Sequence, residues 1–283
     1  MPVLDDVLPW LRCPHCHDPL SREAGTVGCA QGHRFDIARQ GYVSLRSGHS
    51  SNRGDTTAMV LARERALTAG HLETITDGIT EIAAVRLADG PDGAIVDLGA
   101  GTGHHLASLL RACPQRAGVA LEVAPAALRR AARAHPRLGA VGCDVWERLP
   151  LADGAAAVLL NVFAPRNPTE MQRVCHEDGV AIIVTPTPAH LAELVAPLGL
   201  LSVDPAKESR LRTALEPHFA LLDRRQFNSK LSLDRDAAKA IVTMGPSAHH
   251  VDDATLTEHL AAYPEPVEVT AAVEVRVMQP LPL

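Results

Sequence analysis

The sequence predicts an α/β protein in which a doubly wound parallel sheet follows a small N-terminal metal-binding module. Three of the six cysteines lie within residues 13–29. From about residue 93 onward, short apolar stretches alternate with helical ones. Clustered cysteines are typical of metal sites, and strands that alternate with helices are typical of a parallel sheet covered by helices on both faces.

The composition limits the class of protein. The chain has 283 residues, which suits one large domain with a smaller one. Its net charge of -6 argues against nonspecific coating of nucleic acid, so any such contact must come from local patches. Asp5 and Asp6 stand where a signal peptide needs basic residues, and we find no apolar run that could span a membrane. We therefore expect a cytoplasmic protein without membrane contact, and the sequence leaves a homodimer open.

The first element is the cysteine cluster. Cys13, Cys16, Cys29 and His33 follow the pattern C-x2-C-x12-C-x3-H. Zinc is held in a tetrahedron by four such side chains, and one C-x2-C turn supplies two of them. A group of buried free thiols beside a surface histidine is the alternative, which this spacing makes the weaker interpretation. A zinc ion with four protein ligands has no open position, so we expect it to shape a surface rather than to catalyse.

The residues around this cluster are locally basic. Six arginines but only three acids lie between residues 11 and 53, and four of these arginines follow the last zinc ligand: Arg34, Arg39, Arg46 and Arg53. Arginines beside aromatic residues can grip unpaired RNA, but they could equally form a solvated face. We place the zinc-binding module at 1–46, a linker and helices at 47–92, and the sheet domain at 93–283.

The sheet domain opens with a glycine-rich turn. The stretch GAIVDLGAGTGHHLASLL predicts a buried parallel strand, then a turn, then a helix. The turn has the spacing G-x-G-x-G at Gly99, Gly101 and Gly103, whereas a dinucleotide-binding turn would need its third glycine at His104. Asp97, two residues before the turn, suits a ligand with an ammonium group, such as S-adenosylmethionine, better than it suits a pyrophosphate.

Acidic residues end the next two predicted strands. Glu122 lies about 20 residues beyond the glycines, where an acid can bind both hydroxyls of a ribose. Asp144 ends the third strand and suits an adenine amino group. Pro125 opens the helix between these strands. Each carboxylate alone could be a helix cap or an ion-pair partner, but their order at successive strand ends favours ligand binding.

The rest of the chain completes the alternation. A fourth strand ends near Asn161, which could orient a substrate or cap the loop, and Arg166 could hold a phosphate or lie on the surface. A helix is expected to start at Asn167 and Pro168, and a fifth strand follows. A helix and a strand within residues 196–240, with the alternating stretch PVEVTAAVEVRVMQP, predict a terminal antiparallel pair.

Together, the zinc and glycine motifs resemble one family, the RlmA-type 23S rRNA (guanine-N1)-methyltransferases, including their tylosin-resistance branch. The similarity covers the N-terminal two thirds of the chain. Its shared stretches are CPHC, GHRFDIARQGYV, GDTTAMVLARERALTAGHL, DLGAGTGHH and TPTPAHL.

The resemblance implies a class I S-adenosylmethionine-dependent methyltransferase, a Rossmann-like doubly wound fold, with a structural zinc ion bound by the cluster. It implies methylation of a guanine in hairpin 35 of 23S rRNA, nucleotide 748 in the resistance branch and 745 in the housekeeping branch. The expected cofactor-binding residues are Leu72, Asp97, Gly99, Gly101, Gly103, His104, His105, Leu106, Glu122, Asp144 and His190. The expected RNA-binding residues are Arg34, Arg39, Arg46, Arg53 and Arg166, and Asn161 is the candidate for orienting the base.

Three other functions remain as alternatives. One is a small-molecule methyltransferase with a structural zinc ion. Another is a nonenzymatic zinc-ribbon protein that binds RNA, against which the complete set of Asp97, the three glycines and Glu122 argues. The third is an NAD-dependent enzyme, which the glycine spacing disfavours.

Overall fold

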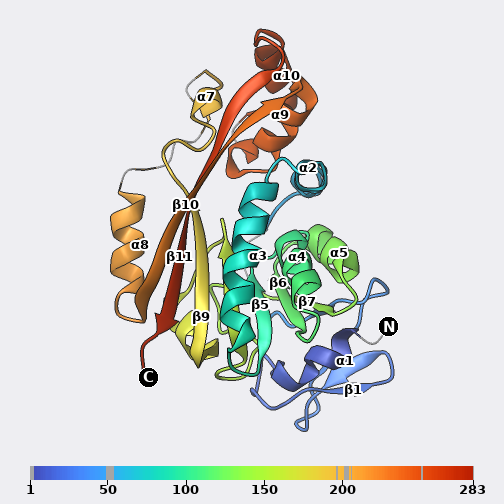
Figure 1. The fold of residues 1–283 in the computed structure, drawn as a ribbon. Helices are drawn as coiled ribbons and strands as arrows, with labels where there is room; N and C mark the ends of the chain where they lie inside the picture. Colours follow the sequence, from blue (N-terminus) through green and yellow to red (C-terminus); the bar gives the residue numbers. More distant parts are fainter. Residues whose placement is uncertain are drawn as a thin grey trace.

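The computed structural model describes residues 3–48, 54–195, 197–200, 204, 206–249 and 251–282, so Arg53 lies outside the described residues. Its centre is a twisted sheet of eight strands in the order β10-β11-β9-β8-β5-β6-β7-β4 (Figure 1). Six of its strands, from β4 at the edge inward to β9, run parallel to one another; in chain order they are β4 (Val43–Ser44), β5 (Ala94–Leu98), β6 (Gly118–Glu122), β7 (Leu138–Gly142), β8 (Ala156–Val162) and β9 (Cys175–Pro186).

Helices cover both faces of this sheet. Because successive side chains of a strand point to opposite faces, Ile95 joins one hydrophobic cluster and Val96 the other. The first cluster includes α3 (Glu73–Ala88), α4 (His104–Ala112) and α5 (Pro125–Ala134). The second includes α1 (Val3–Val7), α6 (Pro168–Val174) and α8 (Lys207–Leu215). Strands buried on both faces explain the continuous apolar runs in the sequence.

The order of the sheet reverses between β5 and β8. From β5 the chain adds β6 and β7 on one side, and then returns to add β8 and β9 on the other. In doubly wound sheets, ligands bind in the crevice at the carboxyl ends of the strands at such a point. Gly99 and Gly101 follow β5 with φ of 69° and 54°, values that glycine adopts without strain.

The N-terminal module packs on the β7 edge of the sheet. After α1 and η1 (Leu8–Trp10), it forms a small antiparallel sheet from β1 (Ser21–Glu23), β2 (Thr26–Gly28) and β3 (Arg34–Asp36). Its last strand, β4, pairs in parallel with β7. Val7 lies so close to Gly139 that a Cβ at Gly139 would be 2.4 Å from a Val7 methyl carbon. The module therefore shares a hydrophobic core with the main sheet.

The C-terminal strands form the predicted antiparallel pair and extend beyond the others. β10 (Phe219–Leu233) pairs with β11 (Val267–Pro280), and β11 pairs with β9. Between them the chain forms α9 (Arg235–Thr243), η2 (Pro246–His249) and α10 (Asp253–Ala261), which lie at the top of Figure 1. We call residues 234–263 the roof; its helix α9 packs against α2 (Thr57–Thr68). A short helix, α7 (Ala192–Val195), follows β9.

Two features differ from the sequence-based expectation. The third strand of the sheet ends at Gly142 rather than at Asp144. The chain turns there because the Asp144 carboxylate accepts a hydrogen bond from the backbone N–H of Trp146 at 3.0 Å. The helices of the roof were not predicted at all. Within the described ranges, no helix combines the length and the apolar character needed to cross a membrane.

Candidate functional site

A cleft of about 890 Å³ opens at the carboxyl ends of β5, β6 and β8, beneath the roof. Its lining includes a predicted carboxylate from or just beyond each of three adjacent strands, namely Asp97, Glu122 and Asp144. All three are buried, with 2%, 7% and 6% of their surface exposed. Buried carboxylates are rare unless they are paired or bind a ligand, so this is the part of the molecule where a cationic or hydroxyl-bearing ligand fits.

Asp97 is an acid whose pKa the cleft raises well above its ordinary value. Its complete burial, together with the negative charge of Glu122, raises the pKa of the Asp97 carboxyl to about 7. A cation beside it would offset both effects, because an opposite charge favours the ionised form. The ammonium group of S-adenosylmethionine is such a cation.

Glu122 holds the glycine-rich turn in place. One carboxylate oxygen accepts from the backbone N–H of Gly101 at 2.9 Å, and the other accepts from the N–H groups of Val123 and Ala124 at 2.8 Å each. Burial raises the pKa of Glu122, and these three donors act against that rise. The carboxylate is therefore fixed in orientation at the end of β6, where the sequence predicts contact with ribose hydroxyls.

Two neighbouring histidines and Leu72 line the cleft on the side of α3 and α4. The Thr76 hydroxyl lies 3.0 Å from Nδ1 of His105, and burial lowers the pKa of His105 to about 3, so this ring is neutral at pH 7. Burial also lowers the pKa of His104. A neutral ring, unlike a protonated one, does not repel a cationic ligand.

His190 enters the cleft from the segment that follows β9. Its Nδ1 accepts the backbone N–H of Ala272 at 3.1 Å, and burial lowers the pKa of His190 to about 4. A neutral ring that accepts at Nδ1 carries its proton on Nε2. The ring centroid lies 5.7 Å from that of Phe163, which follows β8.

Two of the predicted cofactor-binding residues do not line the cleft. A Cβ at Gly103 would lie 3.2 Å from Ala131 on α5, so this glycine allows two helices to pack. Leu106 is fully buried in the hydrophobic cluster beneath α4. Gly99 and Gly101 do line the cleft.

Asn161 is the penultimate residue of β8 rather than its last, and its side chain is fully buried. Its amide donates to the carbonyl of Pro165 at 2.8 Å and accepts from Nε of Arg166 at 2.9 Å. Asn161 is absent from the cleft lining, so of the two interpretations the structural one describes its position: it braces the turn that follows β8. Arg166 does line the cleft. Burial, with a contribution from the charge of Arg276, lowers its pKa to about 10.

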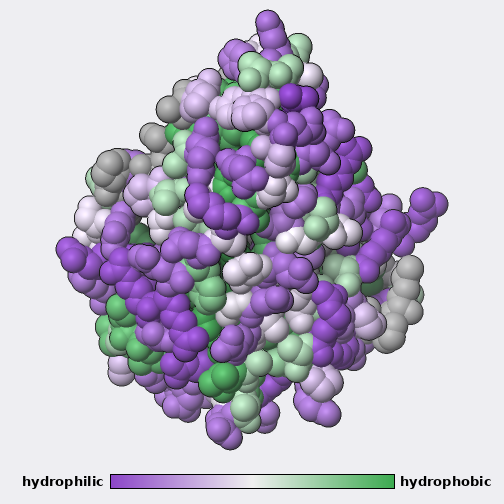
Figure 2. Space-filling model, turned by 45° about the horizontal axis from the view of Figure 1, so that its top comes forward, coloured by the Kyte–Doolittle hydropathy of each residue, from purple (hydrophilic) through white to green (hydrophobic). Residues whose placement is uncertain are grey.

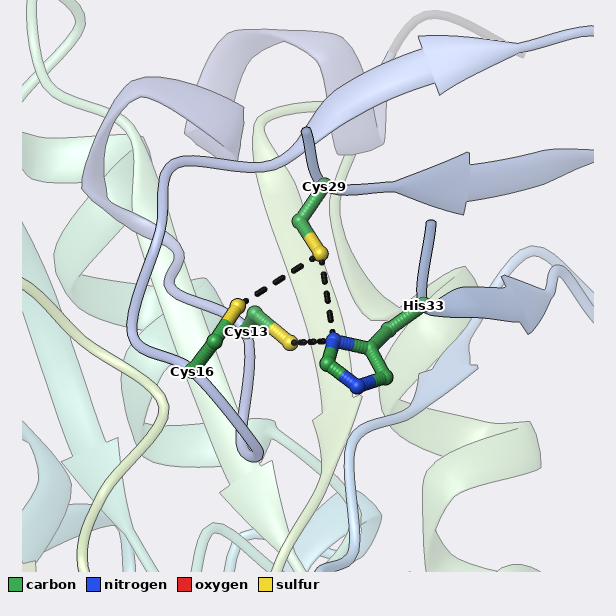
Figure 3. Close-up of side chains that lie close together, drawn as sticks. All are labelled: Cys13, Cys16, Cys29 and His33. Carbon is green, nitrogen blue, oxygen red and sulfur yellow. Dashed lines mark hydrogen bonds between the residues drawn. The ribbon is translucent and has the colours of Figure 1, made fainter. Parts of the chain in front are cut away.

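The four predicted metal ligands meet in the N-terminal module. The ligand atoms of Cys13, Cys16, Cys29 and His33 all lie within 4.8 Å of one another. Figure 3 shows them converging, with Sγ to Sγ and Sγ to Nδ1 separations of 3.3–3.5 Å along the dashed lines. A zinc tetrahedron with bonds of about 2.0–2.3 Å has edges of roughly 3.3–3.8 Å. Donor set and spacing therefore fit a zinc ion with no open coordination position.

Residues 11–46 match the family model of the RlmA N-terminal zinc ribbon. A 23S rRNA (guanine(748)-N(1))-methyltransferase from Streptomyces fradiae is 46% identical to this chain, over 98% of the chain and 99% of its own length. The chain belongs to the RlmA-type 23S rRNA (guanine-N1)-methyltransferase family. A Micromonospora griseorubida protein, provisionally named a 23S rRNA (guanine-N(1)-)-methyltransferase, is 49% identical over 98% of this chain and 99% of its own.

Among solved structures, an S-adenosylmethionine-dependent methyltransferase from Geobacter sulfurreducens in complex with S-adenosyl-L-homocysteine has a TM-score of 0.45 and 14% identity. The match covers 72% of this chain and 91% of the Geobacter sulfurreducens chain. Membership of the RlmA-type family makes this protein an S-adenosylmethionine-dependent methyltransferase with a zinc ribbon, and the order of its sheet agrees with that fold class.

The arginines expected to bind RNA in this RlmA-type chain lie in different settings. Arg34 is exposed and pairs with Glu23. Arg39 is exposed and makes no hydrogen bond or ion pair with the residues that the structure describes. Arg46 is half-buried and close enough to Cys143 for its charge to act on that thiol. Of these three arginines, Arg39 is therefore the one most accessible to a ligand outside the protein.

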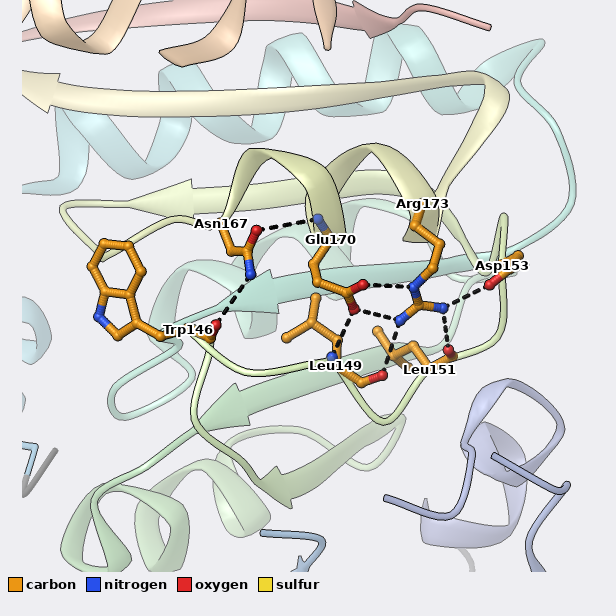
Figure 4. Close-up of polar contacts among 7 residues, drawn as sticks. All are labelled: Trp146, Leu149, Leu151, Asp153, Asn167, Glu170 and Arg173. Carbon is orange, nitrogen blue, oxygen red and sulfur yellow. Dashed lines mark hydrogen bonds and ion pairs between the residues drawn. The ribbon is translucent and has the colours of Figure 1, made fainter. Parts of the chain in front are cut away.

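A polar network fixes the loop between β7 and β8 at the edge of the cleft (Figure 4). Asn167 donates to the carbonyl of Trp146 at 3.1 Å. Glu170 accepts from the backbone N–H of Leu149 at 2.8 Å, and it pairs with Arg173 at 2.6 Å. The loop also touches the zinc-ribbon module, because the N–H of Arg12 donates to the carbonyl of Pro150 at 2.9 Å. The zinc-ribbon module and the main sheet thus meet at this loop.

The sequence-based reasoning missed several residues of the cleft. They are Asp55 just before α2 and Arg63 within it, Trp146 and Phe163 in the loops after β7 and β8, and residues 241, 242 and 244–247 of the roof. The two aromatic residues had a signal, since each stands in a loop directly after a buried strand. The roof residues had none, because their place depends on how far β10 and β11 extend.

Proposed function

We propose that this protein transfers a methyl group from S-adenosylmethionine to N1 of guanine 748 in hairpin 35 of 23S rRNA, and that the methyl group protects the ribosome from tylosin-like macrolides. The observation that carries the proposal is the full-length similarity to the Streptomyces fradiae protein that is named for guanine 748. We expect the enzyme to work in the cytoplasm, where its rRNA substrate is found.

The cleft suits the cofactor by the chemistry of its side chains. We propose that Asp97 binds the ammonium group, Glu122 the ribose hydroxyls and Asp144 the adenine amino group. Leu72, His104, His105 and His190 would line the same cavity. When bound, S-adenosylmethionine supplies an activated methyl group on a sulfonium, so the residues of the chain need only bind and align the two reactants.

Guanine N1 carries a proton and is hidden in a base pair, so the target base must be unpaired or turned out of its stack to react. We propose that the base reaches the cleft between the β8 turn and the roof. Arg166 would hold a phosphate there, because its guanidinium is half-buried in the cleft and makes no ion pair with a carboxylate among the described residues. The proton released from N1 would leave through water.

We propose that residues 1–46 recognise the RNA and that residues 93–283 bind the cofactor, with 47–92 between them. The support for RNA recognition is the position of the zinc ribbon, which joins the β7–β8 loop beside the cleft. Arg34, Arg39 and Arg46 would then contribute phosphate contacts together with Arg53 and Arg166.

Primer extension tests the proposal. Purified protein and S-adenosylmethionine are added to unmodified 23S rRNA, and reverse transcription is read across hairpin 35. A methyl group at N1 blocks pairing, so a new stop at nucleotide 748 is expected. A stop at nucleotide 745 would assign the housekeeping reaction instead. No stop anywhere on the rRNA, with cofactor binding intact, would overturn the proposal and favour a small-molecule substrate.

A further inference from the structure

Phe163 is an aromatic residue that the fold leaves exposed inside the cleft. The chain has only four Phe, two Trp and two Tyr residues. All eight lie in the part of the chain that the structure describes. Of these eight, only Trp146 and Phe163 are exposed, and both line the same cleft. The visible surface is largely hydrophilic (Figure 2). An aromatic ring with 41% of its surface exposed therefore stands out as a ligand contact rather than as a core residue.

The backbone holds Phe163 in an unusual conformation. Its φ is 54°, in the left-handed region that residues with a side chain rarely adopt. Leu191, next to His190 on the other wall, has a φ of 53°. Both residues line the cleft, so two strained turns from different strands meet there. Strained backbone that the surrounding structure maintains is typical of binding and catalytic sites.

The neighbours of Phe163 fix where its ring lies. Its backbone N–H donates to the carbonyl of Val184 at 3.1 Å, which continues the pairing of β8 with β9. The next residue, Ala164, packs so closely on Gly99 that a Cβ added at Gly99 would lie 2.6 Å from the Ala164 methyl group. The turn is braced from below by Asn161. Phe163 is thus held rigidly beside the glycine turn that is proposed to bind the cofactor.

We propose that Phe163 is the surface on which the target guanine stacks while its N1 faces the methyl group. This inference rests on the proposed function. A base that leaves its helix loses its stacking partners, and an aromatic side chain replaces them. Phe163 is the better placed of the two exposed aromatic residues, because it adjoins the glycine turn after β5, whereas Trp146 follows Asp144 at the proposed adenine end.

The test separates the RNA from the cofactor. Methyl transfer to 23S rRNA is measured at saturating S-adenosylmethionine for the wild type, Phe163→Leu, Phe163→Tyr and Trp146→Leu. Cofactor affinity is measured for each by calorimetry. Leu222→Ala is the control, since Leu222 is 43% exposed and lies outside the cleft. Phe163→Leu should lower kcat/KM for rRNA by about 5- to 150-fold, the range found when a stacked base loses its aromatic partner. Phe163→Tyr should restore most of the rate.

Unchanged cofactor affinity in Phe163→Leu would support the inference and show that the variant is folded. A loss of cofactor affinity as large as the loss of rate would overturn it, because Phe163 would then act through His190. Full rRNA activity of Phe163→Leu, or a loss confined to Trp146→Leu, would also overturn it while the proposed function stands. A wild-type enzyme inactive on rRNA would overturn both.

Discussion

Arg63 on α2 donates from Nη2 to the backbone carbonyl of Met244 in the roof at 2.8 Å, across 181 residues of chain. The same guanidinium pairs with Asp55. It also lies over the glycine turn, since a Cβ at Gly101 would be 3.1 Å from Nη1 of Arg63. One side chain therefore connects the linker helix, the glycine turn and the roof.

The first prediction concerns this connection. Arg63→Met should raise the dissociation rate of S-adenosylmethionine about tenfold, because a lost hydrogen bond from a charged group costs about 1.5–3 kcal/mol and the roof is then held less firmly. Stopped-flow measurement of cofactor release checks it. Arg65→Met is the control, because Arg65 is exposed on the same helix and makes no ion pair among the described residues. Equal release rates for wild type and Arg63→Met would show that the roof does not retain the cofactor.

The second prediction is a pH dependence of cofactor binding. The Asp97 carboxyl has a pKa of about 7 in the protein without ligand, and its ionised form is the one that pairs with an ammonium group. Affinity should therefore weaken about tenfold for each pH unit below 7, because a proton must first leave. Calorimetric titration between about pH 5.5 and 7.5 measures the slope.

The raised pKa of Asp97 also determines how the free energy of unfolding changes with pH. Its pKa lies above the ordinary value of 3.8, so between about pH 4 and 7 the folded chain keeps a proton that the unfolded chain has lost. The free energy of unfolding without cofactor should fall as pH rises through that window. Asp97→Asn should remove this part of the dependence and bind cofactor weakly at every pH. A wild type and an Asp97→Asn variant with the same pH profile would contradict both expectations.

The third prediction concerns Glu122. Its two carboxylate oxygens accept from Gly101 on one side and from Val123 and Ala124 on the other. Glutamine has one oxygen and one NH₂ group, so Glu122→Gln can satisfy only one side and turns a donor toward donors on the other. Cofactor affinity should fall about 10- to 100-fold, equivalent to charged hydrogen bonds of about 1.5–3 kcal/mol. Equilibrium binding measures it, with the exposed Glu258→Gln as the matched control.

The succession of parallel strands along the chain and the three acids of the cleft could be predicted, because each depends on a short local pattern. An apolar run followed by an acid or a glycine turn marks the carboxyl end of a buried strand, and parallel strands bring these ends together. The metal ligands could be predicted for the same reason, since Cys13 and Cys16 belong to one turn. In contrast, residues 241, 242 and 244–247 reach the cleft only through the length of β10 and β11, which no local pattern encodes.

Asn161 shows a second limit of the sequence. A polar residue at the end of a fourth strand suggested a contact with the base, but the strand continues to Val162 and turns the Asn161 amide inward. Because successive side chains of a strand point to opposite faces, the apolar run alone did not show which way Asn161 faces. The same boundary places Phe163 in the cleft. Gly103 before α4 and Leu106 within it pack against neighbouring helices and the core and do not line the cleft.

The last prediction concerns the zinc ribbon. Cys16→Ser removes one of four ligands, so the zinc content should fall from about one ion per chain to near zero. The module shares a core with the main sheet through Val27 and Leu45, so the melting temperature should fall as well. Methylation of rRNA should be lost, while cofactor binding should largely remain because the cleft residues lie elsewhere. Elemental analysis, thermal melting and primer extension measure these effects.

Cys113→Ser is the matched control for this variant, because Cys113 is a free cysteine on the far side of the sheet from the cluster. It should keep its zinc and its activity. The comparison separates zinc loss from general damage, because a cysteine is replaced by serine in both proteins. If Cys16→Ser lost its zinc and still methylated rRNA at the wild-type rate, the zinc ribbon would have no part in recognising the RNA, and the cleft alone would have to select its substrate.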